Sequence, residues 1–134
     1  MTSIIDIEGI GPAFAKKLSA AGIRSVEALL KRGATPKGRE EIAHATGLGH
    51  KEILEWVNRA DLYRIKGVGS EYSDLLENAG VDTVVELSKR DAKNLSAKML
   101  EANTKRKVVR RLPTEKQVAD WITQAKRLPR AVSY

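Results

Sequence analysis

Two stretches of this chain repeat one pattern of glycine and aliphatic residues. Residues 7–12 read Ile-Glu-Gly-Ile-Gly-Pro, and residues 65–70, 58 positions later, read Ile-Lys-Gly-Val-Gly-Ser. Each copy continues through a helical pattern to Ala-Gly-aliphatic, at residues 21–23 and 79–81. Two glycines around one apolar residue favour a tight turn with exposed backbone N–H groups. The sequence therefore predicts two related units, each a glycine turn followed by a helix.

Helical signals cover nearly all of the remaining chain. Ser25 and Thr35 are good N-cap residues, and Pro12 and Pro36 suit the first turn of a helix. No segment alternates with period two for long enough to predict a strand. We predict helices over residues 12–21, 25–30, 36–45, 50–62, 70–79, 83–89 and 92–101, and a last helix that carries Trp121. The predicted fold class is all-α.

The repeat also predicts the organisation of the chain. Residues 4–62 form the first copy and residues 63–134 the second, at an offset of about 58 residues. We predict that residues 1–134 form a single compact domain with pseudo-two-fold symmetry between the copies.

The two tryptophans show where the copies differ. Trp56 matches Trp121 at an offset of 65, so seven residues are inserted in the second copy, in the basic segment 104–113. Only six residues precede the first repeated stretch, residues 7–12, which leaves its glycine turn without a preceding helix. We expect the helix that carries Trp121 to return to the first turn and fill that place.

A glycine turn that leads directly into a helix is typical of the helix-hairpin-helix motif, whose usual ligand is a nucleic-acid phosphate. The unpaired N–H groups and the positive dipole end of the helix add to those of the turn. We name the three such turns of this chain the first (Gly9–Gly11), middle (Gly47–Gly49) and last (Gly67–Gly69) glycine turns. The candidate phosphate-binding residues are Gly9, Ile10, Gly11, Ala13, Lys16 and Lys17 at the first turn, and Gly47, Gly49 and Lys51 at the middle turn.

The last glycine turn is a weaker candidate. Gly67 and Gly69 have the same spacing, but Glu71, Asp74 and Glu77 follow on the first two turns of the helix. Carboxylates suit the helix dipole there and repel a phosphate. We expect this turn to be structural or to bind something other than DNA.

The positive charge of the chain is concentrated near its C-terminal end. The net charge is +7, and residues 105–134 contain nine basic and two acidic side chains. Residues 105–111 are the densest part, either a solvated flexible loop or a helical turn whose two valines pack while the basic pairs face outward. The candidate binding residues here are Arg106, Lys107, Arg110 and Arg111. Such a patch fits a polyanionic or acidic partner.

Several classes of protein are disfavoured. The chain has no cysteine, so it contains no disulfide and no thiolate metal site. The two histidines, His44 and His50, have no cysteine partners and predict no metal site. No catalytic constellation, cofactor motif, signal peptide or long apolar run is present, so we expect a cytoplasmic, non-enzymatic protein without a cofactor or membrane span. Aromatic content of 4% is too sparse for a base-stacking surface.

Five segments together resemble a known family. They are residues 7–12, 34–39, 56–62, 65–72 and 109–113. They resemble the bacterial domain of unknown function 4332, a set of proteins related to helix-hairpin-helix domains, and the similarity extends from about residue 4 to the C-terminus. The resemblance implies a helix-hairpin-helix fold and an inferred nucleic-acid-binding role.

Two functions therefore stay open. The first is sequence-nonspecific binding of nucleic acid, duplex DNA foremost, through the first glycine turn and the basic segment. The second is that of a protein–protein adaptor whose glycine turns are structural and whose basic surface docks an acidic partner.

Overall fold

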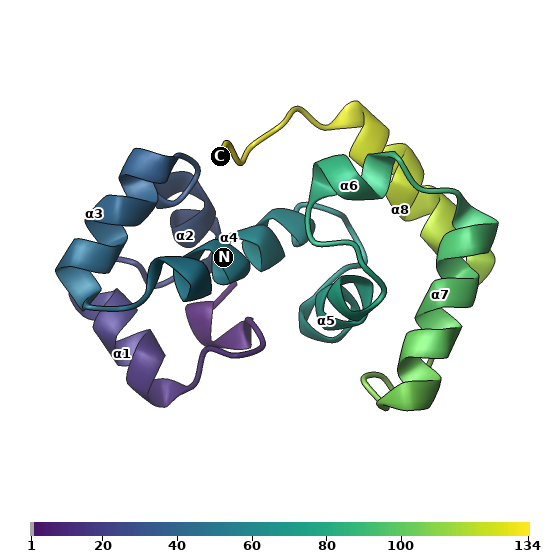
Figure 1. Cartoon of the computed structure of the whole chain (residues 1–134), viewed down its shortest axis with the longest axis horizontal. Coiled ribbons are helices and arrows are strands. Elements are labelled where there is room, and N and C mark those ends of the chain that lie inside the picture. Colours follow the sequence, from purple (N-terminus) through teal and green to yellow (C-terminus); the bar gives the residue numbers. More distant parts are fainter. Residues whose placement is uncertain (1) are drawn as a thin grey trace. The chain divides into compact units, whose positions relative to one another are not determined.

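The structure is a computed structural model that describes residues 2–134, and over this range the chain is all-α, as predicted. A short 3-10 helix, η1 (Ile4–Asp6), precedes eight α-helices (Figure 1). The α-helices are α1 (Pro12–Ala20), α2 (Val26–Arg32), α3 (Pro36–Thr46), α4 (His50–Leu62), α5 (Ser70–Asn78), α6 (Val84–Ser88), α7 (Ala92–Lys105) and α8 (Glu115–Arg127). Among the described residues, the one isolated β-bridge joins Ser3 and Ser25.

Side-chain caps account for most of the helix starts. Ser25, Thr35, Thr83 and Asp91 each accept a hydrogen bond from the backbone N–H three residues later. Thr114 forms a complete capping box with Gln117 at the start of α8. These local signals are why the predicted helices begin where the observed ones do. Helix α7 ends at Lys105, four residues beyond the predicted end at residue 101.

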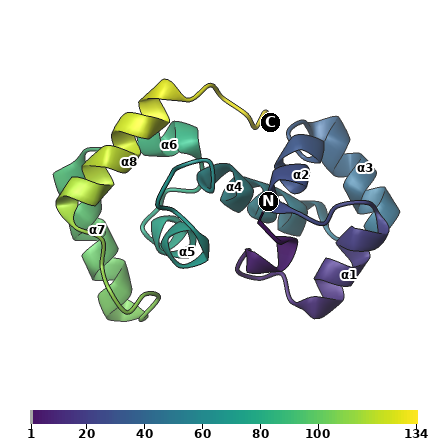
Figure 2. The ribbon, with the colours of Figure 1, turned by 180° about the vertical axis from the view of Figure 1, so that it is seen from behind.

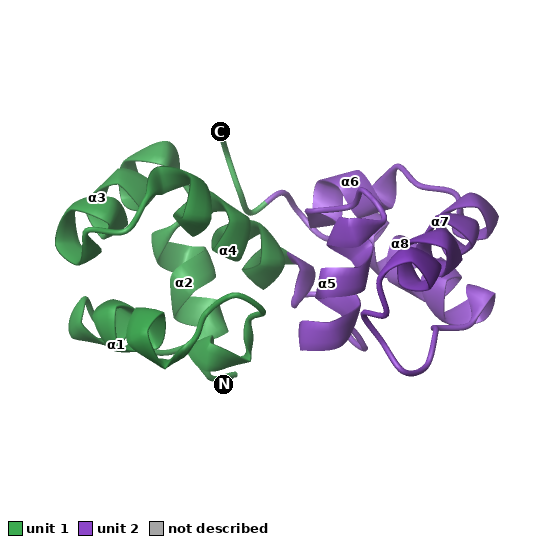
Figure 3. Cartoon of the chain, turned by 60° about the horizontal axis from the view of Figure 1, so that its bottom comes forward, with its two compact units in different colours: residues 1–61, 131–134 green, residues 62–130 purple. Residues whose placement is uncertain are grey.

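The chain divides into two compact units (Figure 3). Unit 1 contains the residues up to Asp61 together with Ala131–Tyr134, and unit 2 contains Leu62–Arg130. The division falls next to the predicted boundary between the two copies of the repeat. A single compact domain with pseudo-two-fold symmetry stays a prediction.

The core of unit 1 is built from aliphatic residues of η1, the four helices and their turns. Leu18, Ile23, Leu29, Ile42 and Ile53 are fully buried. Removing side chains of this size from water stabilises a fold by about 1.5–3 kcal/mol each. This burial holds the short helices together.

The core of unit 2 extends from the last glycine turn to α8. It includes Leu75, Leu76, Leu87, Met99 and Val118. Helix α8 packs against α6 and α7, and both views of the ribbon show it alongside them (Figures 1 and 2).

One contact recurs in both units, between a glycine turn and a tryptophan. A Cβ atom on Gly9 would lie 3.3 Å from Trp56 Nε1, and one on Gly67 would lie 3.0 Å from Trp121 Nε1. Gly9 and Gly67 also have φ angles of 96° and 98°, which glycine adopts without strain. Each tryptophan thus covers the glycine turn of its own unit.

This contact corrects the expected destination of the last helix. We expected the helix of Trp121 to pack on the first glycine turn, but that turn is covered by Trp56 of α4, with η1 preceding it. Phe14 completes the contact, with its ring centroid 5.3 Å from that of Trp56. Helix α8 packs within unit 2, where Trp121 lies against the last glycine turn.

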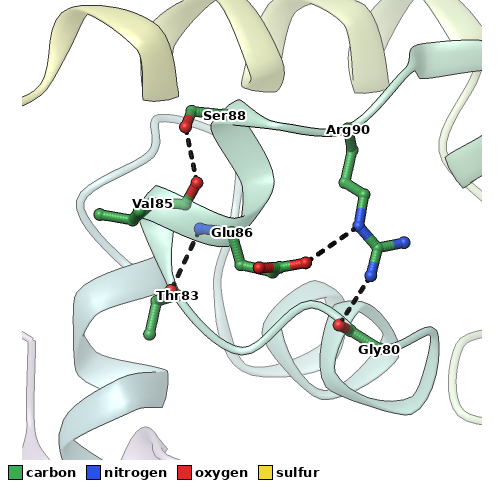
Figure 4. Close-up of polar contacts among 6 residues, drawn as sticks. All are labelled: Gly80, Thr83, Val85, Glu86, Ser88 and Arg90. Atoms are coloured by element: carbon green, nitrogen blue, oxygen red, sulfur yellow. Dashed lines mark hydrogen bonds and ion pairs between the residues drawn. The ribbon is translucent and has the colours of Figure 1, made fainter.

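An arginine at the end of the second α-helix of unit 1, and one just after the second α-helix of unit 2, each close a further turn. Arg32 donates to the carbonyl of Ala21 at 3.1 Å, and Arg90 donates to the carbonyl of Gly80 at 2.9 Å. Figure 4 shows the Arg90 guanidinium between this carbonyl and the Glu86 carboxylate, which lies 3.3 Å away. The arginine therefore ties the short helix α6 to the turn before it.

Candidate functional site

The basic loop, residues 105–111, leaves the end of α7 and has no helical structure beyond Lys105. Its two valines face inward: Val109 is 2% exposed, and Val108 packs against the core of unit 2. Of the two alternatives, the segment is a loop and not a helical turn, and its valines pack inward as expected for the second alternative. The backbone departs from a helix here because a side chain, not a helical carbonyl, accepts its N–H groups.

That side chain is Asn103, in the last turn of α7. Its Oδ1 accepts hydrogen bonds from the N–H groups of Val108 at 2.8 Å and Val109 at 3.0 Å, and its Nδ2 donates to the Val109 carbonyl at 3.3 Å. Tyr72 of α5 holds the other end, since its hydroxyl donates to the Arg111 carbonyl at 3.1 Å. The basic loop is therefore anchored at its centre and at its C-terminal end.

The basic side chains of the loop face outward. Arg106, Lys107, Arg110 and Arg111 are exposed, and none of their side chains forms a hydrogen bond or ion pair within residues 2–134. Lys105, by contrast, pairs with Glu101 at 3.2 Å. An anchored loop thus presents four cations without counter-charges, which creates a local positive potential.

The first glycine turn contains two glycines with different roles. Gly9 is required by its positive φ and by Trp56, and Ile10 is buried. Gly11 has a φ of −84°, and a Cβ atom there would meet nothing within 4 Å. The fold therefore does not require glycine at position 11, and its absent side chain leaves the backbone open.

The backbone around Gly11 offers unpaired donors. No acceptor within the described residues pairs with the N–H groups of Gly11, Ala13 or Phe14. Ala13, Lys16 and Lys17 are exposed. The structure therefore leaves open N–H groups at Gly11 and Ala13, with two lysines one turn further on. The predicted residue Ile10 is different, because its N–H donates to the Ile7 carbonyl at 3.1 Å.

The middle glycine turn is less suited to an anion. Gly47 ends α3 with a φ of 73°, Leu48 is buried, and Lys51 is exposed. Glu52 Oε1 lies 3.1 Å from the position of a Cβ on Gly49, so a carboxylate already lies beside the start of α4. A surface hollow of about 740 Å³ opens here, and its lining includes Lys37, Glu40, Glu41, His44 and His50. Its two further carboxylates also oppose a phosphate.

The last glycine turn is partly occupied by its own unit. The Gln124 side chain accepts from the N–H of Lys66 at 2.8 Å and donates to its carbonyl at 3.2 Å. Glu71 is exposed on the first turn of α5, whereas Asp74 is buried. Gly69, like Gly11, has open space where a Cβ would lie. Among the three carboxylates expected to repel a phosphate, Glu71 is the one that is exposed to solvent.

The structure groups the predicted residues by unit. The first and middle glycine turns belong to unit 1, and the last glycine turn and the basic loop belong to unit 2. Sequence reasoning missed Asn103 and Tyr72, the two residues that anchor the basic loop. No regular pattern marks either of them: Asn103 binds backbone groups five and six residues further on in an irregular loop, and the partner of Tyr72 lies 39 residues away.

Within the described part of the chain, no cluster of three or more histidine and acidic residues could hold a metal ion. No described helix combines the length and apolar character that a membrane span requires.

The family assignment rests on a sequence model. Residues 8–128 match the model of a domain of unknown function, DUF4332. The chain belongs to the DUF4332 family. The predicted resemblance is thereby confirmed, and the matched range includes the three glycine turns and the basic loop of this DUF4332 protein.

Comparison with curated proteins and with solved structures gave no match. The DUF4332 description names no activity.

Proposed function

We propose that this DUF4332 protein binds the phosphate backbone of nucleic acid, duplex DNA foremost, without catalysis and without reading base sequence. The observation that carries the proposal is the anchored basic loop with its four unpaired cations. Phosphate contacts by arginine and lysine supply affinity and position a protein on DNA, but they carry no sequence information.

The anchoring of the loop favours binding. A flexible basic segment loses conformational entropy when it binds, at about 0.5–1.5 kcal/mol for each side chain that becomes immobilised. The backbone of this loop is already fixed by Asn103 and Tyr72, so that part of the cost has been met during folding. The four side chains can then reach successive phosphates from one fixed segment.

The first glycine turn is proposed as a second phosphate contact. Its support is the open Gly11, the unpaired N–H groups of Ala13 and Phe14, and the exposed Lys16 and Lys17. The middle and last glycine turns are not proposed as phosphate contacts, because Glu52 and Glu71 lie at the starts of the helices that follow them.

Duplex is favoured over single-stranded nucleic acid. Single-strand binders stack bases on exposed aromatic rings. Here Trp56 and Trp121 are both buried against glycine turns. Backbone contacts to a duplex need no such surface.

The same two carboxylates, Glu52 and Glu71, favour the second candidate function. An adaptor with purely structural glycine turns needs no anion at them, and its basic loop would dock an acidic protein surface. The experiment below separates the two functions.

The test is fluorescence anisotropy with a labelled 20-base-pair duplex over a range of salt concentrations. Four phosphate contacts predict a slope of log K against log salt of about −3.6. The double variant Arg110→Ala/Arg111→Ala is expected to bind at least tenfold more weakly, with the slope reduced by about 2. The matched control is Lys89→Ala/Lys93→Ala, which removes the same charge from exposed positions of the same unit. It is expected to change affinity less than threefold.

Two further variants test the roles of the first and last glycine turns. Gly11→Asp places a good N-cap and a negative charge at the first glycine turn, so it should keep the fold and weaken binding. Gly69→Asp, the equivalent change at the last glycine turn, should leave binding unchanged. Equal loss in the control pair and the arginine pair would contradict a role for the basic loop. No duplex binding at low salt, together with binding of poly-glutamate, would favour the adaptor.

A further inference from the structure

The C-terminal segment Ala131–Tyr134 belongs to unit 1, although the helix before it belongs to unit 2. It has no helical structure and is drawn out along its length (Figure 3). Val132 is 3% exposed, so this short segment buries an aliphatic side chain. The segment is therefore packed against unit 1 and is not free in solvent.

Both backbone groups of Ser133 are paired with groups of unit 1. Its N–H donates to the Ala34 carbonyl at 2.8 Å, and its carbonyl accepts from Arg39 Nη2 at 2.7 Å. A neighbouring β-strand would pair an extended peptide in the same way, with one acceptor and one donor. Here the loop before α3 supplies the acceptor, and the Arg39 side chain supplies the donor.

Arg39 is an unusual residue for the interior of a small unit. It is 7% exposed, and it donates hydrogen bonds to two backbone carbonyls, those of Gly33 at 2.8 Å and Ser133 at 2.7 Å. No carboxylate pairs with it within the described residues. Burying a guanidinium is costly unless its N–H groups find acceptors. The carbonyl of the extended segment is one of the two acceptors that offset this cost.

Tyr134 completes the contact. Its hydroxyl donates to Oδ1 of Asn58, a buried residue of α4, at 3.2 Å, and its ring lies 5.9 Å from the Arg39 guanidinium carbon. Residues two apart in an extended chain point to the same side. Val132 and Tyr134 therefore present an aliphatic and an aromatic side chain on one side, while Ser133 is bound through its backbone and through its hydroxyl, which donates to the Ala34 carbonyl at 3.3 Å.

We propose that Ala34, Arg39 and Asn58 form a peptide-recognition site for an extended aliphatic–small–tyrosine segment, and that residues 132–134 occupy it in cis. The occupant in trans is a segment of the same chemistry from a partner protein. The site engages three consecutive residues through hydrogen bonds and one buried valine side chain, groups that a segment of another chain can also supply. This inference does not depend on the proposed nucleic-acid binding.

The tethered segment should hide the site from free peptide. A short tether gives an effective concentration in the millimolar range, so a free peptide competes poorly with it. Val132→Asp places a charge where the valine is buried and should release the segment while keeping the full chain. The site would then be open for a ligand in trans.

The experiment titrates a fluorescein-labelled hexapeptide with the sequence of residues 129–134 against the Val132→Asp chain and the unaltered chain. We expect the variant to bind the peptide at least tenfold more tightly. Adding Arg39→Lys to the variant should weaken peptide binding at least fivefold, because an ammonium group cannot span the two carbonyls. A peptide with proline at the Ser133 position lacks the N–H donor and should bind at least fivefold more weakly.

A second route protects against misfolding of the variant. Ser133→Pro in the full chain removes the same N–H from an exposed position, and circular dichroism reports whether either variant keeps its helices. No peptide binding to a folded variant would overturn the proposal. So would peptide binding that Arg39→Lys leaves unchanged, because the site would then not be the one described.

Discussion

At the scale of single residues, the glycines of this chain have different structural roles. A Cβ atom on Gly38 would lie 2.0 Å from the Arg32 carbonyl oxygen, so α2 and α3 can approach this closely because position 38 has no side chain. A Cβ atom on Gly11 would meet nothing, and its φ is ordinary. The same residue type thus serves packing at one position and backbone access at the other.

We predict that Gly38→Ala lowers the free energy of unfolding by roughly 1–3 kcal/mol, because the added methyl group forces apart two backbone segments. Gly11→Ser is the control, and it should leave stability unchanged within a few tenths of a kcal/mol or raise it, since serine is a good N-cap. Urea unfolding followed by circular dichroism measures both. A Gly38→Ala protein as stable as the parent would contradict the close approach.

Asn103 carries a second prediction at this scale. Asn103→Ala removes the acceptor of two loop N–H groups, with an expected loss of about 1–3 kcal/mol. Asn103→Asp keeps an acceptor for both and should lose less than the alanine variant. Hydrogen exchange at Val108 and Val109 provides the direct readout, and we expect faster exchange in the alanine variant. Unchanged exchange would show that the loop is anchored by other contacts.

At the scale of elements, the helices are short, so their ends matter as much as their middles. Helix α6 has five residues, too few to be stable alone. It is held by the Thr83 cap at its start, by Arg90 after its end and by α8 packed against it (Figure 4). Such an element exists because its ends are tied and its apolar face is covered.

We predict that Thr83→Ala lowers the free energy of unfolding by about 1 kcal/mol, because the N–H of Glu86 loses its acceptor. Thr83→Ser keeps the hydroxyl and should lose less. Chemical denaturation of the two variants side by side tests the cap. Equal losses would mean that the threonine methyl group, and not the hydroxyl, is what the position requires.

At the scale of the whole molecule, each unit has its own tryptophan. Trp56 contacts the first glycine turn of unit 1, and Trp121 contacts the last glycine turn of unit 2. Replacing one tryptophan by phenylalanine leaves a chain whose fluorescence reports the unfolding of the other unit. The hydrogen bonds of Ser133 and of the Tyr134 hydroxyl are made with unit 1, so we expect the C-terminal segment to contribute to the stability of that unit.

We predict that Val132→Asp lowers the stability reported by Trp56 by about 1.5–3 kcal/mol, the contribution of burying a valine side chain. The transition reported by Trp121 should move less. Guanidinium unfolding of the two single-tryptophan chains, each with and without Val132→Asp, makes the comparison. Equal shifts of both transitions would indicate that the two units unfold as one cooperative body.

The sequence by itself determined the features that depend on neighbouring residues. The helix starts at Ser25, Thr35 and Thr83 were predictable because a cap and its partner N–H lie three positions apart. The glycine turns were predictable because positive φ and glycine go together at Gly9 and Gly67. The outward basic pairs around two inward valines followed from the alternation of charge and aliphatic residues.

Only the tertiary structure decided which distant groups meet. Trp121 packs on the last glycine turn and not the first, Tyr72 holds a carbonyl 39 residues away, and Arg39 holds one 94 residues away. Local pattern carries no information on these pairs, since each depends on the shape and the unpaired groups left after the helices have packed. The charge of the basic loop was therefore predictable from the sequence. Its anchoring, and the site in unit 1 that binds the C-terminal segment, depend on the tertiary structure.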